Sequence, residues 1–522
     1  MKYIQIELPS LHLLWKRKNG EEIISSAIRT NYPKPGLCYV PSIIQQTGVD
    51  TEVIDMKIRD QDIVVPYGRF QYGDGTMFAS RMGMTFESIA DKVIASDVLG
   101  LSINPTSWAN MAIDFMRFAK RIKPEIKIII GGNEAIFRPE YYLKGGLADI
   151  AVMGEAENII PDLIEFLEGK RKQEDVFGIA YKINGRVVRT KCPEKPKMDD
   201  IPLPALNLLE RDIPLWTNPI ENFPLPEGVK SPMSWLFLSR GCCQKCDYCT
   251  TPQKMGAFRI KSIERIEAEL DYLKEYGIQT LNIWDDSIST VMHSVSLGRE
   301  KGREYLMEIS KMLRDKGFAY ELSQGGMVIR DLWDSQKNQP DVELINEFFT
   351  NKKTTGGFVG FYGQYFPMEC LQVEDPHEKY SKLMSFEKEK EVLRAVLSAG
   401  EIPPAISCSS IIGTIEDTPE GFALATRRLL EIKRIVEDKG GKCLVTPFIH
   451  SIFPGTKLWE RYEKRLVYGI DQFPELYQFQ TAPHRTDYFS PEELTLAKKE
   501  MEKKILTPEQ FRKWNATGKY YW

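Results

Sequence analysis

Apolar positions along the chain follow two periods that replace one another repeatedly. Up to residue 195, short apolar runs of the β type lie at 3–7, 51–55, 97–102, 126–130 and 148–153. Stretches with the helical period separate them, at 40–48, 86–95, 111–122 and 158–167. Strands that alternate with helices predict a parallel, doubly wound α/β sheet. In such a sheet ligands bind beyond the carboxyl ends of the strands.

Polar residues and glycines follow three of these expected strands. They are Ser102, Asn104 and Thr106 after the third strand, Gly131, Gly132 and Asn133 after the fourth, and Gly154 and Glu155 after the fifth. The carboxyl ends of parallel strands meet at one edge of a sheet. We therefore expect these residues to bind the ligand of the first domain.

A second series of elements begins after a proline-rich stretch. Prolines recur between 196 and 233, as in a linker. Six β-type runs then lie at 235–239, 280–284, 318–322, 357–361, 405–411 and 443–448. Helical patterns separate them, at 262–276, 299–315, 341–349, 385–399 and 418–437. Six such repeats predict a parallel barrel or partial barrel with its site at the carboxyl ends of the strands. The expected domains are 1–195, the linker 196–233, 234–456 and a helical C-terminal region 457–522.

Length and charge agree with this division. At about 150 residues per domain, 522 residues allow two to four domains. The net charge of −4 gives no general basic surface for nucleic acid. No basic segment precedes a long apolar run, and no stretch has the length of a membrane helix. We expect a cytoplasmic protein with no nucleic-acid or membrane partner.

Four of the nine cysteines fall within eight residues, 242–249. Cys242, Cys246 and Cys249 have the spacing Cx3Cx2C, and three thiolates from one loop can hold three irons of a 4Fe-4S cluster. The fourth iron then stays open for a substrate. Zinc is the alternative, because Cys243, Cys246 and Cys249 form a Cx2Cx2C, although structural zinc takes four ligands. The nearest histidine is His293, more than 40 residues away.

With this loop after the first strand of a predicted barrel, the chain resembles the radical S-adenosylmethionine (SAM) enzymes over 234–450. Tyr248, the aromatic residue before the third cysteine, also fits that family. The N-terminal region resembles the Rossmann-like cobalamin-binding domain of the cobalamin-dependent class, class B. The segments that carry this resemblance are 31–37 (Asn-Tyr-Pro-Lys-Pro-Gly-Leu), 131–134 (Gly-Gly-Asn-Glu) and 154–157 (Gly-Glu-Ala-Glu).

The resemblance implies three cofactors and a set of residues that contact them. The cofactors are a 4Fe-4S cluster, SAM and cobalamin. The implied SAM contacts are Asp285 and Asp286 to the ammonium, Gln324 to the ribose, Gln364 where the family has a glutamate, and Gly413 along the adenine. An N-cap role is the alternative for the aspartates. The Asp-x-His-x-x-Gly motif is absent from the sequence, so we expect a cobalt without a histidine ligand.

The implied activity is methylation of an unactivated carbon through a 5′-deoxyadenosyl radical and methylcobalamin. A peptide or protein side chain is the expected substrate and a ferredoxin or flavodoxin the expected electron donor. The chain more loosely resembles the archaeal members that act on methyl-coenzyme M reductase, including the glutamine C-methyltransferase. A cobalamin-dependent radical SAM oxidoreductase or cyclase without methyl transfer is the main alternative. A methylthiotransferase is disfavoured because it would need three further N-terminal cysteines, and a zinc-binding module remains the non-enzymatic alternative.

Overall fold

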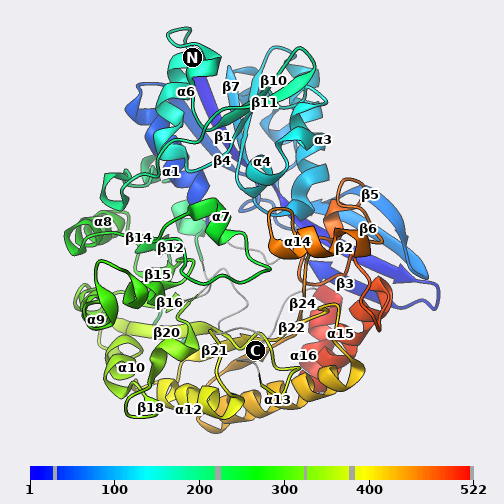
Figure 1. Ribbon diagram of the computed structural model, residues 1–522. Helices are drawn as coiled ribbons and strands as arrows, with labels where there is room; N and C mark the ends of the chain where they lie inside the picture. Colours follow the sequence, from blue (N-terminus) through cyan, green and yellow to red (C-terminus); the bar gives the residue numbers. More distant parts are fainter. Residues whose placement is uncertain (27–31, 218–224, 323–325, 376–381, 518–522) are drawn as a thin grey trace. The chain divides into compact units, whose positions relative to one another are not determined.

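A computed structural model describes residues 1–26, 32–217, 225–322, 326–375 and 382–517 (Figure 1). Contacts within the chain divide it into two compact units. Unit 1 comprises Met1–Leu215, Gln253–Met255 and Ser451–Gln478, and unit 2 comprises Trp216–Pro252, Gly256–His450 and Phe479–Trp522. The domain limits expected at 195, 233 and 456 stay predictions. None of the described helices combines the length and apolar character that crossing a membrane requires.

Unit 1 is built on a seven-stranded sheet in the order β11-β10-β9-β8-β7-β1-β4. Its strands are β1 (Lys2–Glu7), β4 (Asp50–Asp55), β7 (Val98–Ser102), β8 (Lys127–Gly131), β9 (Ile150–Val152), β10 (Ile179–Ile183) and β11 (Arg186–Arg189). The first five of these are parallel, and β10 and β11 are antiparallel. The chain passes from β1 to β4 on one side and then to β7 on the other. The direction of winding therefore reverses between β1 and β7.

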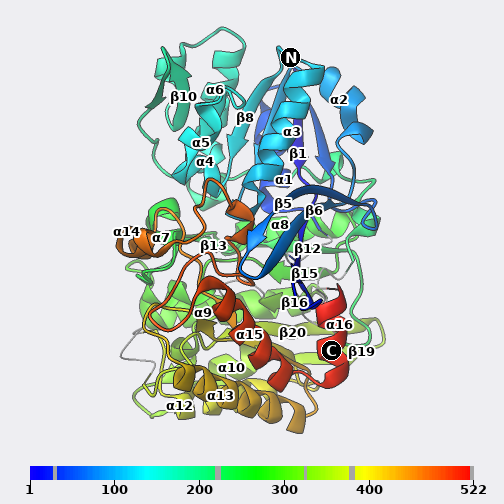
Figure 2. The same cartoon turned by 90° about the vertical axis from the view of Figure 1, so that its right-hand side faces the viewer.

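Helices cover both faces of this sheet. They are α1 (Pro35–Gln46), α2 (Ala90–Ile94), α3 (Ala109–Ile122), α4 (Asn133–Phe137), α5 (Pro139–Leu143) and α6 (Ile160–Leu167). Figure 1 shows α1 and α6 on one side and α3 on the other, and the turned view in Figure 2 brings α3 in front of β1. Ile43 of α1 and Ile164 of α6 join Tyr3 of β1 in one buried cluster. The predicted doubly wound α/β sheet is confirmed.

Unit 1 also contains an antiparallel sheet that the sequence pattern did not predict. It has the order β3-β2-β6-β5, formed by β2 (Ser10–Arg17), β3 (Glu22–Ser26), β5 (Val64–Tyr72) and β6 (Gly75–Met82). The pair Tyr72 and Gly75 closes the β5–β6 hairpin around Gly73 and Asp74. Gly73 has φ of 52°, as two-residue hairpin loops require. This Gly-Asp pair between two β-type runs is the signal that could have predicted the hairpin.

Unit 2 is built on a curved parallel sheet in the order β12-β15-β16-β20-β21-β23. The strands are β12 (Met233–Leu236), β15 (Thr280–Ile283), β16 (Ala319–Leu322), β20 (Gly357–Pro367), β21 (Ala405–Ser409) and β23 (Cys443–Val445). Met233 on β12 and Ala405 on β21 belong to one buried cluster although three strands separate them. The face that carries this cluster is therefore the concave face of an open barrel. The predicted partial barrel is confirmed.

The helices between these strands lie where the sequence pattern predicts them. They are α8 (Ile263–Glu275), α9 (Gly298–Asp315), α10 (Val342–Phe348), α12 (Phe386–Leu397) and α13 (Pro419–Asp438). The C-terminal helices α15 (Pro491–Ile505) and α16 (Pro508–Thr517) follow. Buried Glu502 of α15 accepts hydrogen bonds from Thr446 Oγ1 at 3.1 Å and from Trp514 Nε1 at 3.0 Å. These bonds attach both helices to the end of β23.

Candidate functional site

The three predicted cluster ligands lie on one loop of unit 2. Cys242, Cys246 and Cys249 are half-buried, and Cys243 between them is exposed. The loop starts after the short strand β13 (Ser239–Arg240) and ends at α7 (Thr251–Met255). Gly241 has φ of 95°, and a Cβ there would lie 3.2 Å from the carbonyl oxygen of Ala257. Gly241 thus makes a sharp turn between β13 and the cysteine loop, and only glycine adopts this positive-φ conformation without strain.

Asp285 and Asp286, which follow β15, hold this loop in place. Asp285 Oδ1 accepts the Leu238 N–H at 2.9 Å, and Oδ2 accepts the hydroxyl of Ser239. Asp286 Oδ2 accepts the Gly241 N–H at 2.9 Å, and Oδ1 accepts the Thr251 hydroxyl at 3.1 Å. The two carboxylates thus bind backbone and side chains on both sides of the cysteines.

These contacts differ from an N-cap role, because the donors lie at the two ends of the cysteine loop and not in the segment that follows the aspartates. Asp285 is 2% exposed, and burial raises its pKa to about 7. Asp286 is half-buried, and each of its oxygens has a second lone pair. The predicted contacts with the SAM ammonium stay predictions, and Asp286 is the better placed of the two to accept a further hydrogen bond.

The cysteine sulfurs already accept hydrogen bonds from the protein. Cys242 Sγ accepts the Gln244 N–H at 3.4 Å and the Thr290 hydroxyl at 3.8 Å, and Cys249 Sγ accepts the Thr251 N–H at 3.4 Å. Hydrogen bonds to the sulfurs are one means by which proteins tune iron–sulfur clusters. Burial raises the pKa of Cys242 to about 11, so binding of a metal would displace its proton.

No group of three His, Cys, Asp or Glu side chains converges on a single ion within the described ranges. In an iron–sulfur cluster each thiolate binds a different iron, so the three side chains need not converge on a single ion. The three half-buried thiols on a loop held at both ends therefore fit an iron–sulfur cluster.

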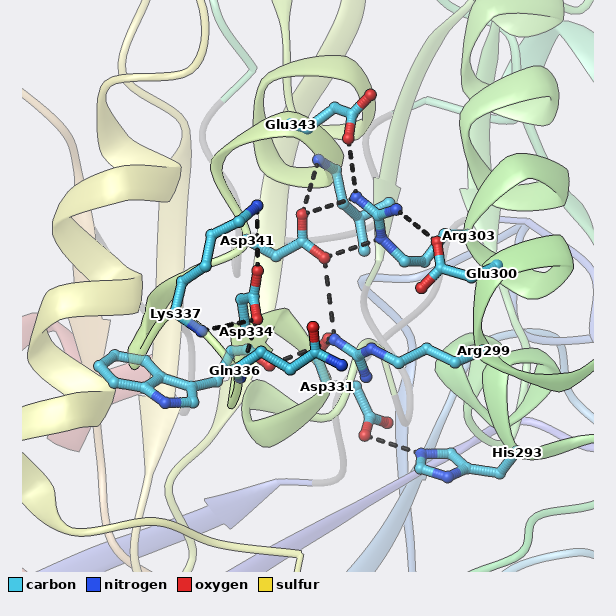
Figure 3. Close-up of polar contacts among 12 residues, drawn as sticks. His293, Arg299, Glu300, Arg303, Asp331, Asp334, Gln336, Lys337, Asp341 and Glu343 are labelled. Carbon is cyan, nitrogen blue, oxygen red and sulfur yellow. Dashed lines mark hydrogen bonds and ion pairs between the residues drawn. The ribbon is translucent and has the colours of Figure 1, made fainter.

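A polar brace connects the loops that follow β15 and β16. Asp331 Oδ1 lies 2.7 Å from His293 Nε2, and Asp331 Oδ2 accepts the Ser289 hydroxyl at 2.6 Å. Figure 3 shows His293 against Asp331, and Arg303 among carboxylates of which Asp341 is nearest at 2.8 and 2.9 Å. The His293–Asp331 pair connects the segment before α9 to the loop between β16 and α10, and the Arg303–Asp341 pair connects α9 to the N-cap residue of α10. The brace joins the segments that follow two neighbouring barrel strands.

The concave face of the barrel carries a buried carboxyl that the sequence pattern did not single out. Glu321 of β16 is 1% exposed and its Oε1 has no hydrogen-bond partner among the described residues. Burial raises its pKa to about 8. It shares its face with Ala319 of the concave cluster. The sequence signal that could have indicated this residue is a single glutamate within the apolar run 318–322.

Gln364 of β20 lies on the opposite face. It is in register with Leu322 and Ile406, one position beyond Gly363, which is in register with Glu321. Successive side chains point to opposite faces of a sheet, so Gln364 is on the convex side. Both atoms of its amide lack a partner in the described part of the chain although it is fully buried. Its contact with SAM stays a prediction, and the register argues against it.

Two further predicted SAM contacts have different outcomes. Gln324 lies outside the described residues. Gly413 has φ of 84°, and a Cβ there would lie 2.6 Å from Leu494 Cδ2. Its N–H donates to Asp417 Oδ2 at 2.8 Å, and its carbonyl oxygen lies 2.8 Å from His484 Nε2. Packing and backbone conformation thus account for glycine at this position, whatever it binds.

In unit 1 the structure brings four of the predicted residues together at the ends of β7 and β8. Asn104 Nδ2 donates to Ser102 Oγ at 3.2 Å, and Asn104 Oδ1 accepts the Asn133 N–H at 3.4 Å. Gly132 has φ of 86°, and a Cβ there would lie 2.8 Å from the carbonyl oxygen of Ile103. The turn after β8 therefore needs glycine to approach the turn after β7.

Among the remaining predicted residues at this edge of the sheet, the polar side chains pair with other side chains, and the two glycines have no close neighbours that would exclude a Cβ. Thr106 Oγ1 donates to buried Glu134 Oε1 at 2.7 Å. Glu155 Oε1 lies 3.4 Å from Lys195 Nζ. A Cβ on Gly131 would meet nothing within 4 Å, and one on Gly154 would only touch Ile159. Their roles in ligand binding stay predictions.

Sequence reasoning did not single out Glu7, Lys34 or Trp108, which lie where the sheet reverses its winding. Glu7, at the end of β1, is fully buried, and Lys34 Nζ lies 2.7 Å from its Oε1 and 3.6 Å from the centroid of the Trp108 ring. Glu7 Oε2, Trp108 Nε1 and Asn133 Oδ1 are buried without hydrogen-bond partners among the described residues. Ligands of doubly wound sheets bind at this crevice, so these atoms fit a ligand rich in hydrogen-bonding groups.

Comparison with known proteins agrees with this arrangement. Residues 22–164 match the family described as B12 binding domain. The chain matches the structure of the cobalamin-dependent SAM radical enzyme OxsB with aqua-cobalamin and SAM bound. The match covers 96% of this chain and 65% of that chain, with a TM-score of 0.62 and 15% sequence identity. The chain has the fold of this enzyme. The radical SAM methyltransferase TsrM from Kitasatospora setae, with tryptophan and a SAM analogue bound, has a TM-score of 0.57 at 12% identity, covering 90% of this chain and 77% of that one.

Two curated relatives are methyltransferases by name. The uncharacterized methyltransferase PH0819 of Pyrococcus horikoshii is 27% identical over 277 residues, which are 52% of each chain. Cytidylyl-2-hydroxyethylphosphonate methyltransferase of Streptomyces wedmorensis is 26% identical over 320 residues, which are 57% of each chain. The chain thus spans little more than half the length of these relatives. Their names agree with the enzyme class that the sequence predicts.

Proposed function

We propose that this chain is a cobalamin-dependent radical SAM methyltransferase. The observation that carries the proposal is the three-cysteine loop, held by Asp285 and Asp286 at the carboxyl end of the first barrel strand, in a chain that also matches a B12 binding domain. When bound, the cluster would supply the electron that cleaves SAM, and cobalamin would supply the methyl group. Cys242, Cys246 and Cys249 would hold the cluster.

The chain's own residues would hold and orient the other groups. In unit 1, Glu7, Trp108 and Asn133 offer unpaired buried polar atoms at the crevice where a cobalamin would bind. In unit 2, Glu321 offers a protonated carboxyl on the concave face, because burial raises its pKa to about 8. A neutral carboxyl can donate a hydrogen bond to SAM or to substrate without a charge that would need a counterion.

The substrate class that we propose is a peptide or protein side chain, with glutamine in methyl-coenzyme M reductase as the specific candidate. The loose sequence resemblance to archaeal enzymes of that kind supports it. A ferredoxin or flavodoxin is the proposed electron donor. A small phosphonate linked to a nucleotide is the second substrate class, because one curated relative is named for such a substrate.

Anaerobic reconstitution of the full chain with iron, sulfide, cobalamin and SAM tests the proposal. We expect 5′-deoxyadenosine, S-adenosylhomocysteine and a substrate heavier by one methyl group, detected by mass spectrometry. A radical oxidoreductase or cyclase is the alternative, because such an enzyme would share the cysteine loop and the match to a B12 binding domain. That alternative predicts 5′-deoxyadenosine without S-adenosylhomocysteine. A chain that binds no iron under these conditions would contradict both.

A further inference from the structure

A buried charged network lies against the cysteine loop. Tyr248, between Cys246 and Cys249, donates its hydroxyl to Glu369 Oε2. Lys382 Nζ donates to Glu369 Oε1 at 2.7 Å and to the Tyr248 hydroxyl at 3.0 Å. The side chains of Lys382 and Glu369 are 13% and 9% exposed. All three groups are thus removed from water and hydrogen-bonded to one another.

This network reaches two of the proposed cluster ligands. Tyr248 is the residue next to Cys249 and is two residues away from Cys246. The Lys382 ammonium, 3.0 Å from the Tyr248 hydroxyl, therefore lies close to the cysteine loop. Solvent screens buried charges far less than exposed ones, so a cluster on these thiolates would experience the charges of both the Lys382 ammonium and the Glu369 carboxylate.

Glu369 is fixed at the mouth of the barrel. It follows the carboxyl end of β20, and its carbonyl oxygen accepts the Ile411 N–H at 2.7 Å. Replacing buried ion pairs by apolar residues is often neutral or stabilising, so stability alone is a weak reason to keep one here. Its position beside the thiols provides a functional reason.

We propose that Lys382 and Glu369, linked through Tyr248, set the reduction potential of the cluster on the cysteine loop. The inference rests on the proposed function. In the step concerned, the electron donor loses one electron and the cluster gains it. A nearby cation stabilises the added negative charge and raises the potential, and a nearby carboxylate lowers it. Lys382 and Glu369 therefore act in opposite directions.

The test is a redox titration of the reconstituted full chain without SAM, followed by electron paramagnetic resonance of the reduced cluster. We expect Lys382→Met to make reduction at least tenfold less favourable, a shift of about 59 mV to more negative potential. Glu369→Gln should shift the potential in the positive direction. Lys382→Arg keeps the charge and should stay close to the wild type. Lys390→Met is the matched control. Lys390 is also a buried lysine in an ion pair, but it lies on α12 and its partner Glu431 on α13.

Tyr248→Phe keeps the inference testable if Lys382→Met fails to fold. It removes the hydroxyl that links Lys382 and Glu369 to the cysteine loop, so we expect a shift of the potential that is smaller than that of Lys382→Met. Unchanged potentials in these variants, or shifts of the same sign for Lys382→Met and Glu369→Gln, would overturn this inference while the proposed function stands. A wild-type chain without a cluster would overturn both, and iron analysis separates the two failures.

Discussion

The two units carry polar residues at the carboxyl ends of parallel strands, but they use them differently. In unit 2, Asp285 and Asp286 accept a hydrogen bond on every oxygen, and the donors lie at the two ends of the cysteine loop. In unit 1, polar atoms of Glu7, Trp108 and Asn133 are buried without a partner among the described residues. Buried polar atoms are nearly always hydrogen-bonded in folded proteins. Satisfied atoms therefore indicate residues that build a site, and unsatisfied ones indicate residues that contact its ligand.

The cysteine loop allows the strongest test of this comparison, because a missing ligand cannot be replaced. We expect Cys246→Ala to lower the iron content after reconstitution from about four per chain to background, since each thiolate binds its own iron. Cys243→Ser is the matched control on the same loop and should keep the iron. Iron and sulfide assays measure both. Equal loss in the two variants would favour the zinc arrangement of Cys243, Cys246 and Cys249.

Glu321 gives a pH-dependent test on the concave face of unit 2. Its pKa of about 8 in the folded chain lies above the value of about 4.3 expected when unfolded. Folding therefore favours the protonated form of Glu321. The resulting contribution to the free energy of unfolding is fully present below about pH 4.3 and is lost as the pH rises to about 8. The full loss is roughly 5 kcal/mol.

The variant Glu321→Gln should not lose this contribution. We expect its free energy of unfolding to rise relative to the wild type between pH 5 and pH 8, as measured by urea denaturation at both values. Glu389, whose pKa burial also raises to about 8, is present in both proteins and cancels from the comparison. A difference between the two proteins that does not change with pH would contradict a buried, protonated Glu321.

The sequence pattern predicted the regular elements better than the contacts of single residues. The six strands and five helices of the barrel could be predicted because the strands form short apolar runs, several of them buried on both faces, whereas each helix buries one face and shows the helical period. The antiparallel sheet of β2, β3, β5 and β6 was missed, although the Gly-Asp hairpin loop at Gly73 was visible. The partners of Asp285 and Asp286 could not be predicted, because these residues are 35 to 47 positions apart and meet only once β12 and β15 have paired. Which face Gln364 takes depends on a register shift between β16 and β20 that no periodicity records.

Glu134 and Trp108 test the same distinction within unit 1. Glu134 accepts hydrogen bonds from Thr106 at 2.7 Å, Arg138 at 2.7 Å and Tyr142 at 2.8 Å. We expect Glu134→Gln to lower the free energy of unfolding by about 2–3 kcal/mol, because bonds to a charged acceptor are weakened or lost. Calorimetry or urea denaturation measures the change.

Trp108→Phe should behave in the opposite way. It keeps an aromatic ring for the Lys34 ammonium and removes the unpaired Nε1–H, so we expect a stability change below about 1 kcal/mol. We expect it to raise the Kd for cobalamin about tenfold, equivalent to about 1.4 kcal/mol of binding free energy. If Trp108→Phe lost stability and kept its affinity for cobalamin, the unpaired atom would have no part in binding.

Asp286 gives the smallest effect and decides between two roles for one carboxylate. Asn at this position keeps one acceptor oxygen, so either the Gly241 N–H or the Thr251 hydroxyl loses its partner at a cost of about 1–2 kcal/mol, confined to the cysteine loop. If Asp286 mainly holds the loop, Asp286→Asn should lose iron several times faster during gel filtration while its affinity for SAM per cluster is unchanged. If it mainly binds the SAM ammonium, the variant should keep its iron and bind SAM more weakly, because a charge-assisted bond is lost. Asp315→Asn, on the exposed face of α9, controls for the loss of one negative charge. The four bonds that Asp285 and Asp286 already make to the loop favour the first outcome.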